Sequence, residues 1–505
     1  MCGIVGYAGN IETACGKPLE VCLQGLERLE YRGYDSAGVA LTAPGMDKVV
    51  VRKKAGRLKN LVEDIERKPM PLATVGIGHT RWATNGEPSD VNAHPHTSMD
   101  GKVAIIHNGI IENASQLRLD LQAEGYRFAS ATDTEVAAKL LGKIVDKIIA
   151  DEGKPDLFKA VRRMARMLEG AFTILAADCR QPDIVVGARH DSPLVVGLGE
   201  GENFLGSDVA AFVAYTKRAM EVDQDQAVCV SADKVIVTDF DGNVVENPKT
   251  YTVDWDASAA EKGGWDSFMD KEIHEDPAAV QRTLLGRFDA NGGITLDEVR
   301  IDEHDFKAID KIIVVACGTA SYAGQVAKYA IEHWVRIPVE IELAHEFRYR
   351  DPILTPRTLV VAISQSGETM DTLMALRHAR EQGSKVLAIC NTQGASIPRE
   401  SDAVLYTHAG PEVAVASTKA FVAQITAAYL LGLYLAQVKG AMFRDEIHQV
   451  LDSLKDMPRK IQWVLDTQPK TIQAAAERMV NANSFLFLGR HVGYPVALEL
   501  SLIHI

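Results

Sequence analysis

Short apolar runs separated by glycine, asparagine and aspartate turns recur through the first 250 residues of the chain. Such runs predict strands, and their close spacing predicts stacked, largely antiparallel sheets. Apolar residues at helical spacing interrupt the pattern four times, so the predicted class is α+β rather than all-β. The predicted strands are 75–80, 103–108, 172–177, 183–188, 193–198 and 234–239, and the predicted helices are 18–29, 115–124, 133–150 and 155–168.

A different pattern begins near residue 311, where a strand, a turn and a helix alternate. The apolar runs that start at 311, 339, 358 and 385 predict an α/β doubly wound domain, which is a parallel sheet with helices on both faces. A long helical region follows from 417 to about 478. Its apolar stretch 425–438 is too short to span a bilayer and is expected to be a core helix.

The run S-F-L-F-L-G-R-H-V-G-Y-P-V-A-L-E at 484–499 repeats the strand, turn and helix opening seen at 311, which predicts the start of a second doubly wound domain. A polar connector with two tryptophans and the pair Gly263-Gly264 lies between the two patterns. The predicted divisions are an α+β sandwich at 2–240, a linker and connecting helix at 241–285, a doubly wound domain at 286–450 and the start of a second at 451–505.

Composition narrows the class of protein. The 505 residues, 47% hydrophobic and 24% charged, are typical of a globular chain of about three domains. The net charge of -14 argues against a nucleic-acid partner, and the seven cysteines form no C-x-x-C pair, as in reduced cytosolic proteins. The first residues lack a signal-peptide pattern. We therefore expect a cytoplasmic protein with small-molecule substrates and neither a nucleic acid nor a membrane as partner.

Cys2 is the first candidate for chemistry, because it lies in M-C-G-I-V-G. Removal of the initiator methionine would leave a thiol with a pKa near 8.5 and an α-amine with a pKa near 7.7 to 8.0 on one residue. The amine could then accept the thiol proton, directly or through one water, so the pattern predicts an N-terminal nucleophile. Cysteine is also a common small core residue, and the hexapeptide alone leaves both interpretations open.

Five ordered motifs in the first half favour the catalytic interpretation. Together they resemble the glutaminase domain of the N-terminal-cysteine, or class II, glutamine amidotransferases over residues 2–240, which implies an N-terminal-nucleophile sandwich. The resemblance implies that Cys2 attacks the side-chain amide carbon of glutamine, forms a γ-glutamyl thioester and releases ammonia. The motifs are M-C-G-I-V-G, Y-R-G-Y-D-S-A-G at 31–38, G-H-T-R-W-A-T-N-G at 78–86, H-N-G-I-I-E-N at 107–113 and T-D-T-E at 132–135.

The same resemblance implies roles for individual residues. Asn108 and Gly109 would donate hydrogen bonds to the oxyanion, although H-N-G is also an ordinary hairpin turn. Arg81 would bind the α-carboxylate of glutamine, and Asp133 would bind its α-ammonium group. A loop that closes over glutamine would carry Trp82, Thr84 and Gly86, whereas Asn85, where some relatives have histidine, is given no role.

Other polar residues of these motifs are expected to be structural. Arg32 and Asp35 are expected to support the strand of the nucleophile, with a salt bridge at least as plausible as a catalytic part. The spacing of the histidines in this region matches no zinc-ligand pattern, so we expect no metal, and we expect no cofactor. These histidines are His79, His94, His96 and His107.

A second constellation starts where the apolar run 358–364 continues into S-Q-S-G-E-T at 364–369. Backbone N–H groups at the start of a helix, together with several hydroxyls, can bind a phosphate without a lysine. Hydroxyl residues also cap helices routinely, so the motif alone leaves a purely structural interpretation open. C-G-T-A-S at 317–321 and V-A-S-T-K-A-F at 415–421 bring further hydroxyls from the same domain.

These segments, the order of the domains and E-F-R-Y-R at 346–350 resemble the glutamine:fructose-6-phosphate aminotransferase (isomerizing) family, with 286–450 as its first sugar isomerase (SIS) domain. The resemblance implies amination and isomerisation of fructose 6-phosphate to glucosamine 6-phosphate, with L-glutamine as nitrogen donor, by a homodimer. Ala320 stands where many relatives have serine. The implied sugar-phosphate contacts are Thr319, Ser364, Gln365, Ser366, Thr369 and Ser417.

The last residues depart from the family pattern. After Ala497-Leu498-Glu499 the family continues with G-A-L-K-L-K-E-I-S, whereas this chain has L-S-L-I-H-I. We expect the segment from about 483 to be poorly held, the isomerising residues to lack counterparts and sugar amination to be impaired, as in a fragment or a mis-ended reading frame.

Two alternatives to this function are open at this stage. One is a class II glutaminase that delivers ammonia to another acceptor, although S-Q-S-G-E-T and the lack of a Walker-type loop argue against it. The other is a sugar-phosphate-binding regulator with a silent N-terminal domain. Separate thermal-shift measurements with glutamine and with fructose 6-phosphate would distinguish them.

Overall fold

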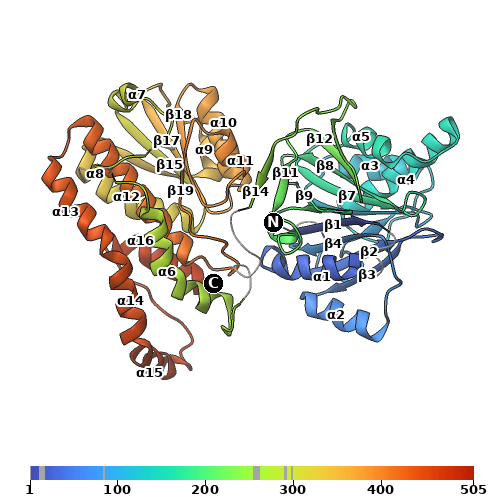
Figure 1. Ribbon diagram of the computed structural model, residues 1–505, viewed down its shortest axis with the longest axis horizontal. Coiled ribbons are helices and arrows are strands. Elements are labelled where there is room, and N and C mark those ends of the chain that lie inside the picture. Colours follow the sequence, from blue (N-terminus) through green and yellow to red (C-terminus); the bar gives the residue numbers. More distant parts are fainter. Residues whose placement is uncertain are drawn as a thin grey trace. The chain divides into compact units, whose positions relative to one another are not determined.

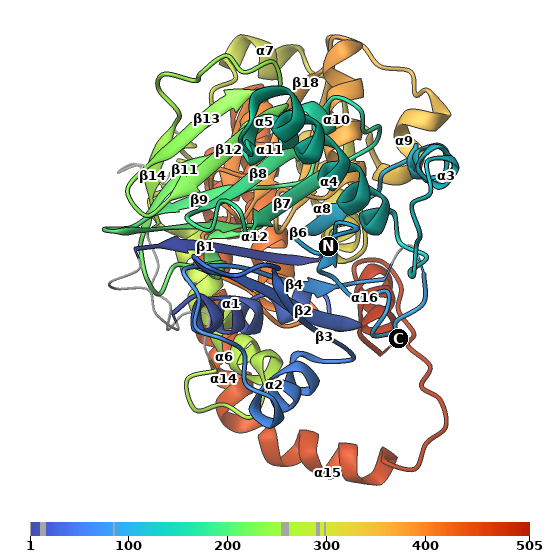
Figure 2. The same cartoon turned by 90° about the vertical axis from the view of Figure 1, so that its right-hand side faces the viewer.

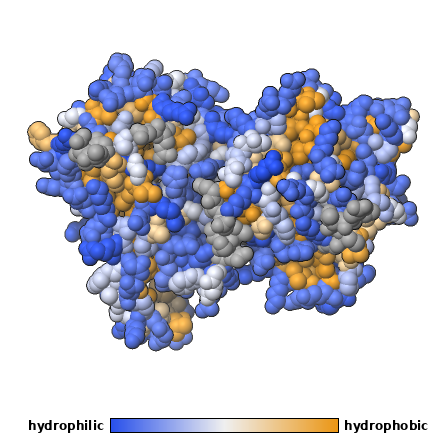
Figure 3. Space-filling model, viewed as in Figure 1, coloured by the Kyte–Doolittle hydropathy of each residue, from blue (hydrophilic) through white to orange (hydrophobic). Residues whose placement is uncertain are grey.

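The computed structural model describes residues 2–10, 17–83, 86–253, 262–288, 293–296 and 299–504. Contacts divide the chain into two compact units, Met1–Glu261 and Lys262–Ile505, called unit 1 and unit 2 below. Hydrophilic residues cover most of the visible face of each unit (Figure 3).

Unit 1 contains two stacked antiparallel sheets (Figure 1). In spatial order the first sheet comprises β14 (Thr250–Thr252), β11 (Arg218–Glu221), β9 (Val195–Leu198), β10 (Glu202–Gly206), β1 (Gly3–Gly9), β4 (Val75–Arg81), β2 (Ser36–Thr42) and β3 (Val50–Ala55). The second comprises β13 (Val235–Asp239), β12 (Gln226–Ser231), β8 (Ile184–His190), β7 (Phe172–Asp178), β6 (Val103–Gly109) and β5 (His96–Thr97).

Helices cover both outer faces of this sandwich. Figure 2 shows α1 (Lys17–Arg28) and α2 (Leu58–Arg67) below the first sheet, and α4 (Asp133–Glu152) and α5 (Leu157–Ala165) on the second. Strands β1, β4 and β7 are buried throughout, because each lies between the opposite sheet and a helix layer. This explains their nearly continuous apolar runs. The predicted α+β sandwich is confirmed, together with a further helix, α3 (Ala114–Ala123), near its predicted bounds.

Unit 2 is built on a five-stranded parallel sheet with helices on both faces. Figure 1 shows α8 (Thr319–Val335) and α12 (Lys419–Lys439) on one side of the sheet and α9 (Ala344–Arg350), α10 (Met370–Glu381) and α11 (Ser396–Glu400) on the other. The predicted doubly wound fold is confirmed. Its strands, in spatial order, are β16 (Val339–Leu343), β15 (Lys311–Ala316), β17 (Thr358–Ser364), β18 (Lys385–Cys390) and β19 (Ala403–Tyr406).

Several helices pack around α12, and this packing explains its apolar sequence. In the described part of the chain, α12 is the one helix long and apolar enough to cross a membrane by length and composition, but 61% of its apolar window is buried inside unit 2. Ala427 and Leu431 of α12 lie in the core, as predicted. The remaining helices are α6 (Phe268–Leu284), α7 (Glu303–Ala308), α13 (Arg444–Lys455), α14 (Met457–Thr467), α15 (Pro469–Met479) and α16 (Gly493–His504).

The strand predicted near residue 484 does not form, and this expectation was wrong. The stretch 483–490 has no regular structure, and Leu486 and Leu488 are 84% and 82% exposed. A strand needs a neighbouring strand for its backbone hydrogen bonds, and the described residues provide none there. Helix α16 is nevertheless held against α8, with Ala497 and Glu499 buried.

Candidate active sites

Cys2 lies where strand β1 begins, beside the end of β4. The antiparallel pairing of Gly3 with Thr80 brings the Cys2 thiol to the backbone of Trp82, whose N–H donates to the sulfur over 3.2 Å. Gly3 is needed for this approach, because a Cβ atom there would lie 2.5 Å from the Thr80 hydroxyl oxygen and 2.8 Å from Leu29 Cβ. The strand pairing therefore holds the nucleophile candidate close to the R-W-A-T motif.

The surroundings of Cys2 favour the protonated thiol. Burial raises the pKa of Cys2, although the Trp82 N–H and the positive charge of Arg81 act in the opposite direction. A thiol with a raised pKa is a weak nucleophile until a base removes its proton. The site therefore needs a base beside the sulfur, and the terminal amine of a processed Cys2 would fill that need.

Asn108 and Gly109 end strand β6 next to Cys2. The Asn108 side-chain Nδ2 donates to the Cys2 carbonyl oxygen over 2.7 Å. Because Ile110 bonds to Ala171 in the adjoining pair of the β6–β7 ladder, the Gly109 N–H points away from β7. Gly109 has φ +122°, and a Cβ there would lie 2.0 Å from the Ala171 carbonyl oxygen, so only glycine fits.

His79 holds the Asn108 amide in this orientation. Its Nε2 lies 3.0 Å from Asn108 Oδ1 and 2.9 Å from the His107 carbonyl oxygen. Both partners accept hydrogen bonds, so Nε2 carries the proton and the Asn108 NH₂ group faces Cys2. Burial lowers the pKa of His79 to about 3, which keeps the ring neutral. Sequence analysis considered His79 only as a zinc ligand and missed this contact.

Arg81 and Asp133, the predicted contacts of the glutamine α-carboxylate and α-ammonium groups, are close enough to interact electrostatically. Arg81 is 3% exposed and donates through Nη2 to the Gly86 carbonyl oxygen over 3.1 Å. Burial lowers the pKa of Arg81, while the charges of Cys2 and Asp133 act to raise it, so the three groups are electrostatic neighbours. Asp133 is the first residue of helix α4. Its carboxylate accepts hydrogen bonds from the backbone N–H groups of Ile111 and Thr134.

The loop after β4 contains the other predicted glutamine contacts. Trp82 is 44% exposed, and its ring packs edge-to-face on Tyr34, with ring centroids 5.3 Å apart. Gly86 has φ +80° and lies against Asn92 and Ala131. Thr84 and Asn85 fall outside the described residues.

Arg32 and Asp35 have separate structural partners. Arg32 pairs with Asp208 at 2.5 Å, next to Ser207, whose hydroxyl accepts from the Ile4 N–H of β1. Asp35 accepts from the Ala83 N–H over 2.8 Å, in the loop that follows β4. Each residue thus supports a different segment around Cys2.

The four histidines considered as zinc ligands pack as neighbouring rings. His94 lies 4.3 Å from His79 and 5.3 Å from His96, between ring centroids. Burial lowers the pKa of all four rings, including His107. Neutral, closely packed rings support the strands around Asn108.

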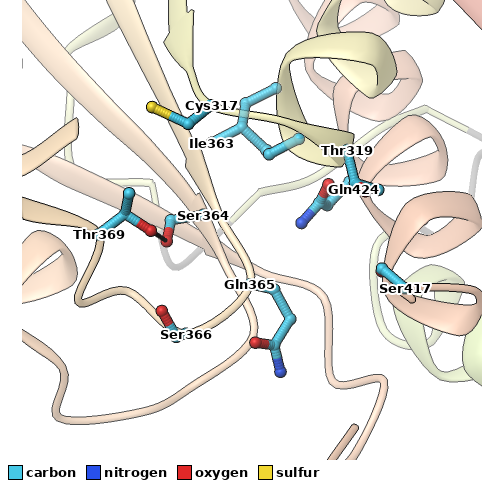
Figure 4. Close-up of a pocket in the computed structure, with 10 residues that line it drawn as sticks. Cys317, Thr319, Ile363, Ser364, Gln365, Ser366, Thr369, Ser417 and Gln424 are labelled. Carbon is cyan, nitrogen blue, oxygen red and sulfur yellow. Dashed lines mark hydrogen bonds between the residues drawn. The ribbon is translucent and has the colours of Figure 1, made fainter. Parts of the chain in front are cut away.

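Unit 2 contains a cavity of about 180 Å³ at the carboxyl ends of β15 and β17 (Figure 4). Strand order reverses between these two strands, and open α/β sheets bind ligands at such a point. All six residues predicted as sugar-phosphate contacts line this cavity. The complete lining is Cys317, Thr319, Ala320, Ile363, Ser364, Gln365, Ser366, Thr369, Ser417 and Gln424.

The S-Q-S-G-E-T loop is shaped by its own hydrogen bonds. Ser364 Oγ accepts from the Gly367 N–H over 3.0 Å and lies 3.2 Å from the Thr369 hydroxyl. Gly367 has φ +67°, and a Cβ there would lie 2.5 Å from Ala395 Cβ, so glycine is required. The loop leads directly into α10, whose positive N-terminal end favours an anion.

Two of the predicted contacts already donate their hydroxyl protons to carboxylates. Thr319 donates to Glu499 over 2.9 Å, and Ser417 donates to Glu412 over 2.9 Å. Both oxygens can still accept, so they suit sugar hydroxyls better than phosphate oxygens.

Gln424 of α12 is a lining residue that sequence analysis missed. It is 2% exposed, and its Oε1 has no hydrogen-bond partner in the described part of the chain. The side chain ends beside Thr319 in Figure 4. The sequence does contain a signal that could have pointed to this residue, because Gln424 is the one amide side chain between residues 420 and 435.

Comparisons with known proteins show the family to which the chain belongs. Family models match a glutamine amidotransferase domain at residues 79–214 and a SIS domain at residues 306–434. The chain is 61% and 62% identical to glutamine–fructose-6-phosphate aminotransferase [isomerizing] of Corynebacterium diphtheriae and of Corynebacterium efficiens, over 99% of this chain and 79% of each relative. Among solved structures, the C-terminal domain of glucosamine-fructose-6-phosphate aminotransferase from Francisella tularensis is 38% identical, with a TM-score of 0.45 over 47% of this chain and 66% of that chain. The chain belongs to the glutamine–fructose-6-phosphate aminotransferase (isomerizing) family.

Proposed function

We propose that the function of the protein is glutamine-dependent amination and isomerisation of fructose 6-phosphate to glucosamine 6-phosphate, with glutamate as second product, and that the described residues of this chain supply glutamine hydrolysis and sugar-phosphate binding. Unit 1 is the glutaminase and unit 2 binds the sugar phosphate. The observation that carries the proposal is the convergence of Cys2 with the Asn108 amide, whose Nδ2 lies 2.7 Å from the Cys2 carbonyl oxygen.

In the first step, Cys2 Sγ bonds to the side-chain amide carbon of glutamine and its proton passes to the α-amine exposed by removal of Met1. Asn108 Nδ2 and the Gly109 N–H stabilise the oxyanion of the tetrahedral intermediate. The carbon–nitrogen bond then breaks, and the returned proton lets nitrogen leave as ammonia. Water hydrolyses the remaining thioester to glutamate and restores the thiol.

Recognition of free glutamine is assigned to charged groups of opposite sign. Arg81 binds the α-carboxylate and Asp133 the α-ammonium group, and the loop with Trp82, Thr84 and Gly86 closes over the amino acid. The electrostatic proximity of Arg81 to both Cys2 and Asp133 supports this assignment.

In unit 2 the phosphate is assigned to Ser364, Gln365, Ser366 and Thr369 at the start of α10, and the sugar hydroxyls to Thr319 and Ser417. The shared cavity and the free acceptor capacity of the last two oxygens support this division. We further propose a cytoplasmic homodimer, for which the family resemblance is the support.

Replacing the nucleophile tests unit 1. We expect Cys2→Ala to abolish release of glutamate and ammonia from glutamine, because the Cys2 sulfur is the atom proposed to form the thioester. The matched control is Cys229→Ala, since Cys229 is a half-buried thiol of β12 away from the site. Glutamine turnover retained in Cys2→Ala, measured by glutamate release, would reject Cys2 as the nucleophile.

Removing one hydroxyl tests unit 2. We expect Ser366→Ala to weaken fructose 6-phosphate binding about tenfold, because a hydrogen bond to a charged group contributes about 1.5 kcal/mol or more. Isothermal titration calorimetry gives the affinity, and Ser453→Ala on the exposed side of α13 is the control. Equal affinities in all three proteins would remove Ser366 from the phosphate site.

A further inference from the structure

Three metal-ligating side chains of unit 2 meet at the edge of its parallel sheet. Cys317 follows β15, His345 lies at the start of α9 directly after β16, and Asp371 lies in the first turn of α10 after β17. The strands β16, β15 and β17 are adjacent and parallel, so their carboxyl ends bring these residues together. None of the three has a role in the proposed reaction.

The distances between these side chains fit a single bound cation. One ligand atom from each residue lies within 4.8 Å of the others, and Cys317 Sγ lies 3.9 Å from His345 Nδ1. Ligand atoms around a tetrahedral zinc ion are about 3.3 to 3.6 Å apart, given bonds of about 2.0 to 2.3 Å. Shifts of the ligand atoms by less than about 1.5 Å would therefore bring them to these separations. Small side-chain rotations can produce such shifts.

The donor set selects the kind of metal. A thiolate, an imidazole and a carboxylate suit borderline transition metals such as Zn²⁺, whereas Ca²⁺ and Mg²⁺ prefer oxygen ligands alone. His345 and Asp371 are exposed and Cys317 is half-buried, so an ion can enter from solvent. We propose that Cys317, His345 and Asp371 form a binding site for a borderline divalent cation, with Zn²⁺ as its best occupant and a fourth position open to water.

Binding at this site includes a balanced proton transfer. Zinc binds cysteine as the thiolate, whereas a free cysteine with its ordinary pKa of about 8.5 is a thiol at neutral pH. The ion forms a sulfur–metal bond as the sulfur–hydrogen bond breaks, and the proton passes to buffer without any redox change. One proton is thus released for each ion bound.

The metal site is distinct from the hydroxyls proposed to bind the sugar phosphate. Cys317 also lines the cavity, but in Figure 4 its sulfur points away from Thr319 and Gln424. An ion held by this sulfur would tie together the segments after β15, β16 and β17. Binding to the folded state alone would raise the stability of unit 2 with ion concentration.

Cobalt titration of the full chain tests the site. The background is Cys2→Ala, because a terminal thiol with its own amine also chelates metals. We expect one Co²⁺ per chain, a thiolate-to-cobalt charge-transfer band, tetrahedral visible bands, displacement by Zn²⁺ and release of one proton. No such bands in this background would overturn the proposal.

Variants of each ligand keep the test decisive. Cys317→Ser should abolish the charge-transfer band, and His345→Asn and Asp371→Asn should each weaken Co²⁺ binding at least tenfold. His345 and Asp371 are exposed, so these two variants can be made without disturbing the core. Cys229→Ser is the matched control and should bind normally. If Co²⁺ binding is lost only in Cys317→Ser and not in the other two variants, the thiol alone holds the ion. That result would also overturn the three-ligand site.

Discussion

A single buried histidine determines which atom of the Asn108 amide faces the nucleophile. His79 Nε2 donates to Asn108 Oδ1, and on the other side Asn108 Nδ2 donates to the Cys2 carbonyl oxygen. Without His79 the amide could rotate and present an oxygen to a developing negative charge. His79 is therefore a positioning residue that acts through Asn108 rather than on the substrate.

We expect His79→Met to lower kcat for glutamine hydrolysis by roughly a hundredfold to a thousandfold, the usual effect of losing one oxyanion donor, with little change in KM. Methionine has a similar volume but no N–H. Steady-state kinetics measure the two parameters, and His79→Gln, which restores an N–H donor, should recover part of kcat.

The control for this variant is His94→Met, because the His94 ring packs on His79 at 4.3 Å without bonding to Asn108. A comparable fall in kcat in His94→Met would indicate general damage to the core. The affinity for a glutamine-derived aldehyde, which forms an oxyanion with Cys2, should fall in His79→Met while affinity for glutamate stays constant.

At the scale of elements, helix α6 holds the loop that carries Ser417. Glu272 of α6 accepts from the Val413 and Ala414 N–H groups at 2.6 and 3.2 Å. The other charged groups packed here are Lys271, Glu275 and Asp276 of α6, Glu412 of the loop and Lys419 of α12, which bonds to Glu275 at 2.6 Å. This polar contact between a helix and a loop supports one wall of the cavity.

The α6 contact predicts a pH dependence. Burial raises the pKa of Glu272 from 4.5 to about 7. Between pH 4.5 and about 7 the folded chain therefore keeps a proton on Glu272 that the unfolded chain has lost. Its contribution to stability is thus complete below about pH 4.5 and is lost as the pH rises through about 7. Glu272→Gln keeps an acceptor oxygen but cannot titrate. We expect its free energy of unfolding to change less between pH 5 and 8 than that of the parent chain.

Urea unfolding at a series of pH values measures this difference. The control is Glu381→Gln, a change at the exposed end of α10. Its free energy of unfolding should change with pH as steeply as that of the parent chain. A Glu272→Gln profile that runs parallel to the parent profile across the whole range would show that Glu272 does not titrate in this window.

Sequence reasoning succeeded where an element is determined by its own apolar pattern. The four strands that start at 311, 339, 358 and 385 and the helix at 133–150 match β15 to β18 and α4 closely. The strand expected near 484 failed, because a strand forms only with a partner and local pattern carries no information about one.

The residues of the candidate sites also fall into two groups, those that the sequence predicted and those that only the structure shows. Residues within ordered motifs, such as Asn108 and Ser366, were predicted as site residues because the motifs resemble those of a family. His79 and Glu499 were missed because each acts through a contact with a residue distant in sequence. Gln424 was missed because its place in the cavity depends on the folded arrangement of α12. Such contacts are properties of the tertiary structure.

At the scale of the whole molecule, each unit builds its site where its strands end. In unit 1 the start of β1 and the ends of β4 and β6 supply the residues around Cys2. In unit 2 the carboxyl ends of β15 and β17 supply the cavity. Rigid strands thus position the residues proposed for chemistry, and the loops that follow the strands complete each site.

The cavity of unit 2 is lined entirely by uncharged side chains, whereas the whole chain has a net charge of -14. Fixed dipoles at short range would hold a phosphate dianion there, and background electrolyte weakens such contacts far less than it weakens long-range attraction between ions. Raising potassium chloride until the Debye length falls from about 10 Å to about 3 Å should therefore leave the fructose 6-phosphate dissociation constant nearly constant. Calorimetric titrations across that series measure it, and a steep loss of affinity would reveal a cationic group at the ligand. Tolerance to ionic strength would distinguish this binding mode from capture by lysine or arginine.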